Sequence, residues 1–380
     1  MTSEVDFEPS RRGTVLVLPR FEDACVLSEG VGFDRLIAGE ERLVYVQPCV
    51  AERGRLMATI NLGEAAGPPR QAFDPAILCS LLGAYRSRLA EVRCSPGLGI
   101  GKMRWKGREI SLFRRGKIVI RRALNERDVY RTIRFLLRLI WGSVTCGLCG
   151  RTAVNCVVNE CGRCARAPPA REKAQTVRLE ALLSAPLWTR GYEDLERAAA
   201  EISSLQDLVA KLPVEGPHPP IERLESDFRR YVQRAVHSAL LFVIETPERD
   251  KAVLGLALMG LAHGLEMVHG SSMRILRRLE GEPDLLGALP EAEGPIKAVL
   301  GAMRTAWEIN VEAMRAFRHG DSDSGLRVKK RYGKLREDLS KLEEETARSG
   351  DERLRLVIED LVREVGTIAQ RGLFAAQLVA

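Results

Sequence analysis

The stretch TCGLCGRTAVNCVVNECGRCA, residues 145–165, separates two halves of the chain that differ in their hydrophobic pattern. It contains two Cys-x-x-Cys pairs separated by 11 residues, namely Cys146 with Cys149 and Cys161 with Cys164. A tetrahedral zinc ion prefers thiolates at about 2.3 Å, and a two-residue spacing lets both sulfurs of one turn reach the same ion. The spacing therefore predicts a structural zinc site with these four cysteines as its ligands.

A fifth thiol leaves alternatives open for this stretch. Cys156 lies between the two pairs and could substitute for one of the four ligands. An iron–sulfur cluster is the second interpretation, because such clusters are also held by four thiolates. The third is a set of unbound or disulfide-bonded cysteines, although a cytoplasmic chain of this length does not need disulfides. With four protein sulfurs the metal would have no open position, so the site would be structural.

Before this stretch, the pattern is that of short strands with two helices. A capping carboxylate and a proline, Asp74-Pro75, predict the start of the first helix. We expect helices over 75–92 and 125–141, and strands over 14–18, 43–50, 56–62, 102–106, 109–113 and 117–121. The chain is therefore expected to be multidomain, with a basic α+β domain at 1–142 and a small four-cysteine zinc segment at 143–168.

After the cysteine stretch, helical periodicity is nearly continuous and is broken at prolines and glycines. We expect an all-α domain at 172–380, with a lead-in helix near 172–186 and six longer helices near 192–213, 220–246, 248–280, 291–318, 322–348 and 351–379. A proline-rich link divides the six helices into two sets of three. This division indicates a duplication, with three-helix repeats at about 190–282 and 290–380.

The positive charge of the chain is concentrated in one region. The 380 residues carry a net charge of +7, whereas residues 101–140 alone hold 13 Lys and Arg against 3 Asp and Glu. Such a patch is typical of a surface that binds a polyanion such as nucleic acid, and the alternative is a solvated charged surface. The candidate phosphate-binding residues are Lys102, Arg104, Lys106, Arg108, Arg114, Arg115, Lys117, Arg121 and Arg122.

Residues 56–141 contain the motifs ATINLG, DPAIL, PGLGIGKMRW and ISLFRRGKIVI, in the order strand, helix, strands, helix. This segment resembles one half-repeat of the TATA-box-binding protein fold, mainly through the turn at 114–117 and the Leu-Phe before it. The resemblance implies a curved sheet that holds DNA, with Phe113 near a position where the family's phenylalanines wedge between bases. One half-repeat is half of a saddle, and the sequence leaves open whether a homodimer completes it.

The helical half carries AMRAFRHGD at 313–321, where a repeat's first helix is expected to end, and TPERD at 246–250, where a third helix is expected to start. It also carries LEMV at 265–268 and VREVG at 362–366, at corresponding places in the two repeats. With these motifs it resembles the PhoU family, regulators of phosphate uptake that are built from two three-helix repeats. The resemblance implies a regulatory module that binds a protein partner.

The family's metal-binding Glu and Asp do not carry over. They correspond to Glu266 with Gly270 in one repeat and to Arg363 with Thr367 in the other. Three residues spaced three apart could form a replacement metal site: His263, Glu266 and His269. The alternative is that the histidines lie on a partly buried helix face and Glu266 makes a hydrogen bond, because such spacing alone does not define a site.

The chain contains no nucleophile elbow, no His-Glu-x-x-His and no Walker loop, and its first histidine is His218. We therefore expect no enzyme. The amino terminus lacks an apolar run, and the most apolar stretch, 252–268, includes two polar side chains, so we expect a cytoplasmic protein without membrane insertion. The sequence favours a regulatory or adaptor protein linked to phosphate uptake or transcription; the alternative is a zinc-containing nucleic-acid-binding protein.

Overall fold

The computed structural model describes residues 16–17, 45–49, 54–61, 71–146, 149–157, 185–211, 221–246, 249–281, 294–348 and 351–379. By its internal contacts the chain divides into two compact units. The sheet unit comprises Met1–Val157, Cys161–Ala167 and Ala239–Leu256, and the helical unit comprises Val158–Glu160, Pro168–Ser238 and Ala257–Ala380. The sequence pattern, by contrast, predicts one helical domain over all of 172–380.

Five antiparallel strands form most of the sheet, in the order β3-β7-β6-β5-β4. Their bounds are β3 Leu56–Asn61, β4 Ala90–Ser95, β5 Ile100–Trp105, β6 Arg108–Phe113 and β7 Lys117–Ala123. Two short strands, β1 (Leu16–Val17) and β2 (Tyr45–Pro48), both pair with β3, the first parallel and the second antiparallel. They share one edge of β3 because β7 occupies the other.

The hairpin between β5 and β6 follows from its turn residues. Lys106 and Gly107 both have positive φ, 46° and 82°, which is the backbone of a type I′ turn. Glycine adopts this conformation without a steric penalty, and the turn sets the register in which Trp105 faces Arg108. The strands expected at 102–106, 109–113 and 117–121 are confirmed to within two residues.

The first helix is shorter than its sequence pattern predicts. Helix α2 spans Pro75–Ala84, and the residues up to Val92, expected to be helical, instead form a 3₁₀ turn followed by the edge strand β4. Antiparallel pairing of β4 with β5 takes precedence over helix propensity here, with a bulge at Glu91, whose φ is 55°. A disulfide between Cys79 and Cys94 also joins α2 to β4.

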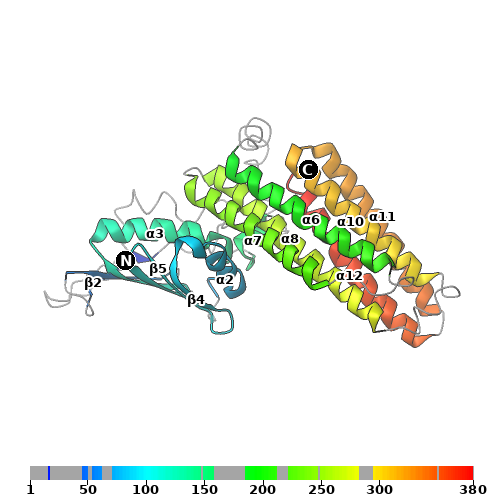
Figure 1. Cartoon of the computed structure of the whole chain (residues 1–380), viewed down its shortest axis with the longest axis horizontal. Helices are drawn as coiled ribbons and strands as arrows, with labels where there is room; N and C mark the ends of the chain where they lie inside the picture. The colour runs from blue at the N-terminus through cyan, green and yellow to red at the C-terminus, as the bar shows by residue number, and fades with distance from the viewer. Residues whose placement is uncertain are drawn as a thin grey trace. The chain divides into compact units, whose positions relative to one another are not determined.

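One face of the sheet is buried under α2 and α3, the latter spanning Glu126–Ile140 (Figure 1). Asn125 caps α3 by accepting a hydrogen bond from the backbone N–H of Asp128. The sheet residues buried on this face are Ala58, Ile60, Met103, Ile110, Leu112, Ile118 and Ile120. Because side chains alternate along a strand, the residues between them lie on the opposite face, which α2 and α3 leave open.

The end of α7 and the start of α8 pack within the sheet unit. Arg138 of α3 is buried and donates a hydrogen bond of 2.9 Å to the carbonyl of Ile244 in the last turn of α7. Leu256 of α8 lies close to Gly142, where an added Cβ would be 3.8 Å from it. The Arg138 guanidinium satisfies the Ile244 carbonyl, which the end of α7 would otherwise leave without an intrahelical partner.

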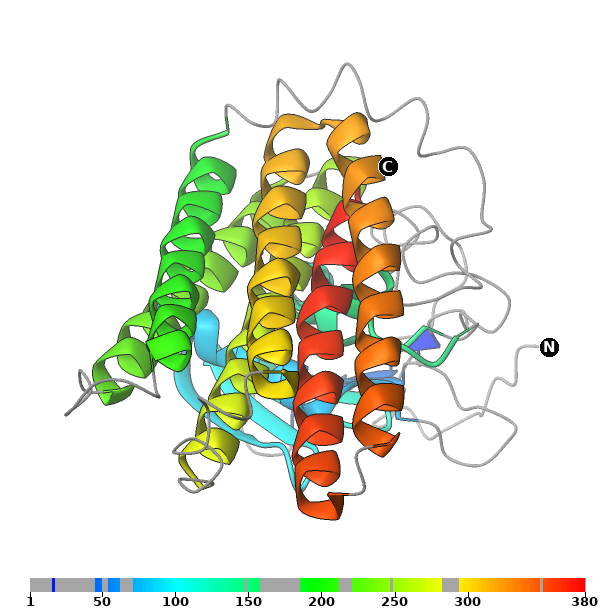
Figure 2. The same ribbon diagram turned by 90° about the vertical axis from the view of Figure 1, so that its right-hand side faces the viewer.

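The six long helices expected after the cysteine stretch are all present: α6 Pro186–Lys211, α7 Ile221–Glu245, α8 Arg249–Glu280, α10 Pro295–His319, α11 Ser322–Arg348 and α12 Glu352–Ala376. The lead-in helix expected near 172–186 lies outside the described residues, except at its last two positions. Helices α10, α11 and α12 pack against one another, and α6 packs against α10 (Figure 2). Gly372 permits close contact of α12 with α10, because a Cβ there would lie 2.7 Å from Ile309.

One helix in the described part of the chain, Ala252–Glu280, is long and apolar enough to cross a membrane by length and composition alone. About two thirds of its most apolar window, 67%, is buried inside the structure. Core helices of folded domains meet the same criterion of length and composition.

Candidate metal centre and nucleic-acid interface

Three cysteines of the 145–165 stretch lie together in the structure. The sulfur atoms of Cys146, Cys149 and Cys156 are all within 4.8 Å of one another, and those of Cys149 and Cys156 are 3.3 Å apart. Thiolates at about 2.3 Å from a tetrahedral ion would be about 3.8 Å apart, so the three sulfurs are spaced to share one metal. Cys156, expected only as a substitute, is thus a member of the cluster, whereas Cys161 and Cys164 lie outside the described residues.

A tight turn holds the first two cysteines. The N–H of Cys146 donates to the carbonyl of Arg151 at 2.7 Å, and the N–H of Gly150 donates back to the carbonyl of Cys146 at 2.8 Å. Gly150 has a φ of 70°, which glycine adopts without strain. This turn brings Cys149 back toward Cys146, as the Cys-x-x-Cys spacing predicts.

A short helix, α4 (Ala153–Val157), supplies the third cysteine directly after the turn. The N–H of Cys156 donates to the carbonyl of Thr152 at 2.8 Å, so the sulfur is carried on the first turn of this helix. Within the sheet unit, the backbone N–H of Ala153 donates to Val144, which forms an isolated bridge with Phe73. The cysteine cluster is therefore fixed to the sheet unit by backbone pairing.

The electrostatics of the cluster favour either protonated thiols or a bound cation. Cys146 and Cys156 are buried and Cys149 is half-buried. The hydrogen bond with Cys146, followed by burial and the neighbouring Cys149, raises the pKa of Cys156 far above that of an ordinary thiol. A divalent cation would reverse this effect and hold the sulfurs as thiolates. The thiol chemistry and spacing fit a soft metal ion, and the three sulfurs would leave one tetrahedral position for a further ligand.

Several of the expected phosphate-binding residues share the open face of the sheet. Lys102 lies opposite Ser111 and Arg93, Ser111 lies opposite Val119, and residues two apart along a strand share that face. We use the term sheet face for Arg93, Lys102, Phe113, Lys117 and Arg121. Its four cations are exposed and make no ion pair with any residue that the structure describes. Phe113 is half-buried among them.

Two further arginines near this face are partly neutralised by carboxylates. Arg104 contacts Glu91 at 2.7 Å and Glu109 at 3.5 Å, and Arg122 contacts the same Glu109 at 3.2 Å. Both arginines remain partly exposed. Arg104 and Glu109 are two residues from Lys102 and Ser111, so they lie on the same side of the sheet as the sheet face. To bind nucleic acid, both arginines would have to exchange a carboxylate for a phosphate.

Arg108 belongs to the interior rather than to a phosphate-binding surface. Its guanidinium contacts the carboxylate of Asp128 at 2.6 and 2.8 Å, and the exposed fractions of these side chains are 13% and 8%. The same carboxylate accepts the backbone N–H of Leu124. The pair fastens β6 to the start of α3, so the expectation that Arg108 contacts phosphate is corrected by its burial.

The remaining candidate phosphate-binding residues lie in the turns at the two ends of β6. Lys106 is in the β5–β6 turn, with its ammonium 4.9 Å from the centre of the Trp105 ring. Arg114 and Arg115 are exposed in the β6–β7 turn, and the backbone of Arg114 bonds to Gly99 and Ala72. These arginines extend the positive charge next to Phe113 at one end of the sheet face.

The histidines proposed for a helical metal site do not converge. His263 and Glu266 approach to 3.4 Å, but the buried ring of His269 stacks on Phe228, with centroids 4.2 Å apart. Burial lowers the pKa of His269 below its ordinary value. This arrangement agrees with the alternative interpretation of the motif, in which the histidines lie on a partly buried helix face and Glu266 makes a hydrogen bond. Among the residues that are described, metal-type side chains cluster only at the three cysteines.

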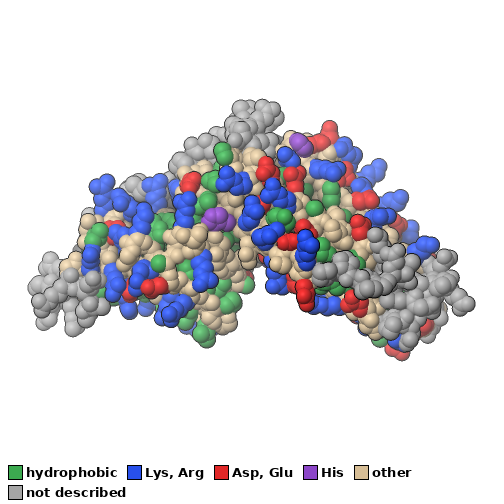
Figure 3. Space-filling view, in the orientation of Figure 1, with side chains coloured by type: hydrophobic (Ala, Val, Ile, Leu, Met, Phe, Trp, Pro, Cys, Tyr) green, Lys and Arg blue, Asp and Glu red, His purple; other side chains and the backbone are tan. Residues whose placement is uncertain are grey.

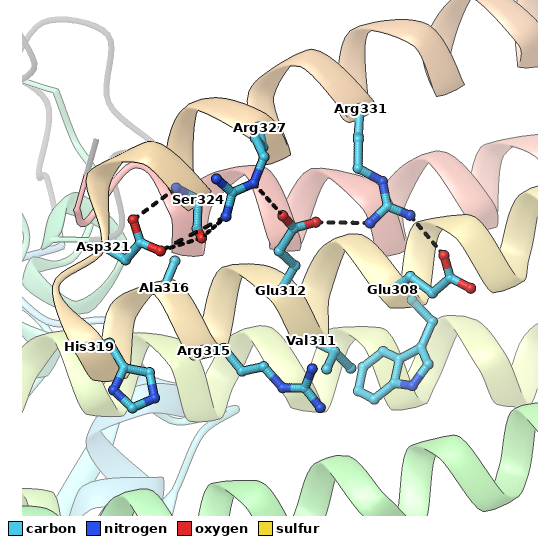
Figure 4. Close-up of a pocket in the computed structure, with 11 residues that line it drawn as sticks. Glu308, Val311, Glu312, Arg315, Ala316, His319, Asp321, Ser324, Arg327 and Arg331 are labelled. Atoms are coloured by element: carbon cyan, nitrogen blue, oxygen red, sulfur yellow. Dashed lines mark hydrogen bonds and ion pairs between the residues drawn. The ribbon is translucent and has the colours of Figure 1, made fainter.

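A hollow of about 620 Å³ lies over α10 beside α11 in the helical unit (Figure 4). Arg331 reaches across it to Glu308 at 2.7 Å and to Glu312 at 2.8 Å, and Arg327 contacts Glu312 at 3.4 Å. At one end, a hydrogen bond from Ser324 lowers the pKa of Asp321. Cations and carboxylates in this hollow therefore largely neutralise one another.

Comparison with known proteins adds no assignment. No protein-family model matches the chain, and neither a curated protein nor a solved structure matches it. Function has to be argued from the geometry of the cysteine cluster and the sheet face.

Proposed function

We propose that the protein is a non-enzymatic regulator whose sheet unit binds nucleic acid through the sheet face. The observation that carries this proposal is the set of four exposed cations without carboxylate partners in the described part of the chain. Arg93 and Lys102 are directly opposite one another, an arrangement of like charges that destabilises a sheet. A surface that departs from this rule is better explained by an external anion than by stability.

The dimensions of the sheet face suit a phosphate backbone. Lys102 is two strands away from β7, roughly 10 Å, and Lys117 and Arg121 are four residues apart, roughly 13 Å along the strand. Each strand of duplex DNA carries one charge per about 3.4 Å of helix axis, so several phosphates would meet these cations. Phe113 adds an apolar contact at one end.

The salt dependence of binding tests this proposal. Labelled duplex DNA and RNA are titrated with the full-length protein between about 50 and 200 mM salt, and four phosphate contacts predict about a 100-fold loss of affinity over that range. A sheet-face triple variant, Lys102→Gln, Lys117→Gln and Arg121→Gln, should bind much more weakly. A control triple variant of exposed lysines in α11, Lys330→Gln, Lys334→Gln and Lys341→Gln, has the same net charge and should bind as the wild type does. Absence of binding to any nucleic acid would refute the proposal.

We also propose that the cysteine cluster holds a structural Zn²⁺ through Cys146, Cys149 and Cys156, with Cys161 or Cys164 as fourth ligand. The close sulfurs and their attachment to the sheet unit support this proposal. When bound, the ion would supply cross-linking rather than catalysis. Elemental analysis of protein purified without added metal should find one zinc per chain; iron with acid-labile sulfide would instead indicate an iron–sulfur cluster.

For the helical unit we propose a PhoU-like regulatory role toward a protein partner. Support comes from the six-helix order and from the turn after α10, where Gly320 has left-handed backbone and precedes Asp321. Co-elution with a transporter ATPase or a kinase from the same cell would favour this role. The double variant Glu308→Gln and Glu312→Gln removes only the ion pairs between α10 and α11. If this variant no longer co-elutes with the partner, the partner contacts this hollow.

A further inference from the structure

Helix α3 carries a second row of cations, on the side that faces away from the sheet. Arg127, Arg131 and Arg134 follow the spacing i, i+4 and i+7, so they line one side of the helix. All three are exposed and make no ion pair within the described ranges. We call these three residues the α3 ridge, and Figure 3 shows Lys and Arg side chains gathered over this helix.

The ridge is costly for the helix that carries it. Like charges four residues apart destabilise a helix, and a cation in the first turn, such as Arg127, opposes the helix dipole. Of the two carboxylates in α3, Asp128 is buried and already bonded to Arg108, and Glu126 directly precedes Arg127, a spacing at which two side chains do not face each other. Neither folding nor capping therefore explains the row, and an external anion would.

The ridge and the sheet face lie on opposite sides of the sheet unit. The apolar side of α3, with Val129, Ile133 and Leu136, is buried against the unit's core, so the arginines point away from the sheet. The sheet face is the side that α2 and α3 leave open. A stiff duplex that lies along one surface cannot contact the other, because the persistence length of DNA is about 500 Å.

We propose that the α3 ridge is a second nucleic-acid-binding surface, and that the protein bridges two duplex segments, one on each side of the sheet unit. Arg127 and Arg134 are about 10 Å apart along the helix, which matches the axial rise of about three phosphates on one strand. This inference rests on the proposed function of the sheet face. It adds a second binding surface, which would bind another nucleic-acid duplex.

The test is capture of one duplex by another. Unlabelled duplex is fixed to beads, the full-length protein is added, and a second, labelled duplex is then offered at low salt. The wild-type protein should retain the labelled duplex. A ridge triple variant, Arg127→Gln, Arg131→Gln and Arg134→Gln, should remain bound to the beads through its sheet face but retain at least about tenfold less label, as expected when three phosphate contacts are lost. The α11 control triple variant should behave as the wild type does.

Each outcome decides between the two proposals. If the wild-type protein binds no duplex, the proposed function itself fails. If it binds the beads without capturing label, only the bridging inference fails. If the ridge variant still captures label, then the second duplex is held elsewhere, as it would be in a dimer of sheet faces, and the inference is overturned. A single variant, Arg131→Lys, keeps the charge and should retain capture if the ridge acts electrostatically.

Discussion

The two units treat their positive charges differently. In the helical unit, arginines reach carboxylates on neighbouring helices: Arg331 contacts Glu308 and Glu312, and Arg274 contacts Glu364 at 2.7 Å. In the sheet unit, the cations of the sheet face and the α3 ridge have no such partner within the described residues. Figure 3 shows this contrast as mixed blue and red over the helices and mostly blue over the sheet unit.

The contrast teaches that charge content alone does not locate a binding surface. A cation that is held by a carboxylate contributes little net field, whereas unpartnered cations on one surface add up to a positive potential. They also repel one another, so the sheet unit gives up stability at this surface. Two features of the sheet unit have no counterpart among the described residues of the helical unit: the cysteine cluster and the disulfide between Cys79 and Cys94.

Metal removal should produce the largest effect on stability, and it should affect the sheet unit but not the helical unit. Because a structural zinc site contributes roughly 10 kcal/mol in small domains, chelation should unfold the sheet unit and leave the helical unit folded. Thermal unfolding followed by hydrogen exchange resolves the two. Cys156→Ser should act as the chelator does, and Cys49→Ser, at a buried cysteine outside the cluster, is the control. If chelation unfolded both units equally, the two units would not differ in their dependence on metal, contrary to this account.

The buried pair of the sheet unit should rank second. Arg108→Ala leaves Asp128 buried without its partner and should cost about 3–5 kcal/mol of unfolding free energy. Arg331→Ala in the helical unit breaks a more exposed pair and should cost about 1 kcal/mol or less. Denaturant unfolding measures both. Similar costs would show that the two pairs do not differ in their burial as the structure has it.

Removing a single cation of the sheet face should have a moderate effect on binding and at most a slight, stabilising effect on folding. Lys117→Gln removes one phosphate contact and should reduce the slope of log affinity against log salt by about 0.9. Lys334→Gln in α11 should leave the slope unchanged. If the two substitutions shift the slope equally, the binding is a property of net charge and not of this surface.

The smallest effect concerns pH and lies in the helical unit. Burial lowers the pKa of His269 below its ordinary value of 6.5, so the unfolded chain binds a proton that the folded one does not. The contribution of His269 to stability is therefore complete above about pH 6.5 and falls as the pH drops below it. His269→Gln should flatten this decline. Glu225 and Arg229 also act on the ring, so a decline unaltered by the substitution would assign it to other groups.

Sequence periodicity and turn chemistry predicted most of the elements. The turn at Arg114-Arg115-Gly116 and the alternation around Ile110 and Ile118 located three strands, and proline and glycine breaks located six helices. Strand β4 was missed because its run is short and follows a good helix, and its pairing with β5 is a tertiary effect. Arg93 was missed as a surface residue for the same reason. Disulfide connectivity cannot be deduced from cysteine spacing.

The candidate site was predicted in composition better than in geometry. Arg108 shares its side of β6 with Ile110 and Leu112, so the alternation already placed it inside, but charge was counted without regard to strand parity. Cys156 entered the cluster because α4 follows the turn at once, a local fold that Cys-x-x-Cys spacing does not specify. The α3 ridge was visible as an amphipathic pattern, and its lack of ion pairs within the described residues became apparent only in three dimensions.

The most direct test of the central claim is the salt dependence of duplex binding for three proteins: wild type, the sheet-face triple variant and the α11 control triple variant. The account predicts that the slope falls by about 3 for the sheet-face variant and stays at the wild-type value for the control. Equal slopes for all three proteins would contradict the claim that the unpartnered cations of the sheet unit form the nucleic-acid interface.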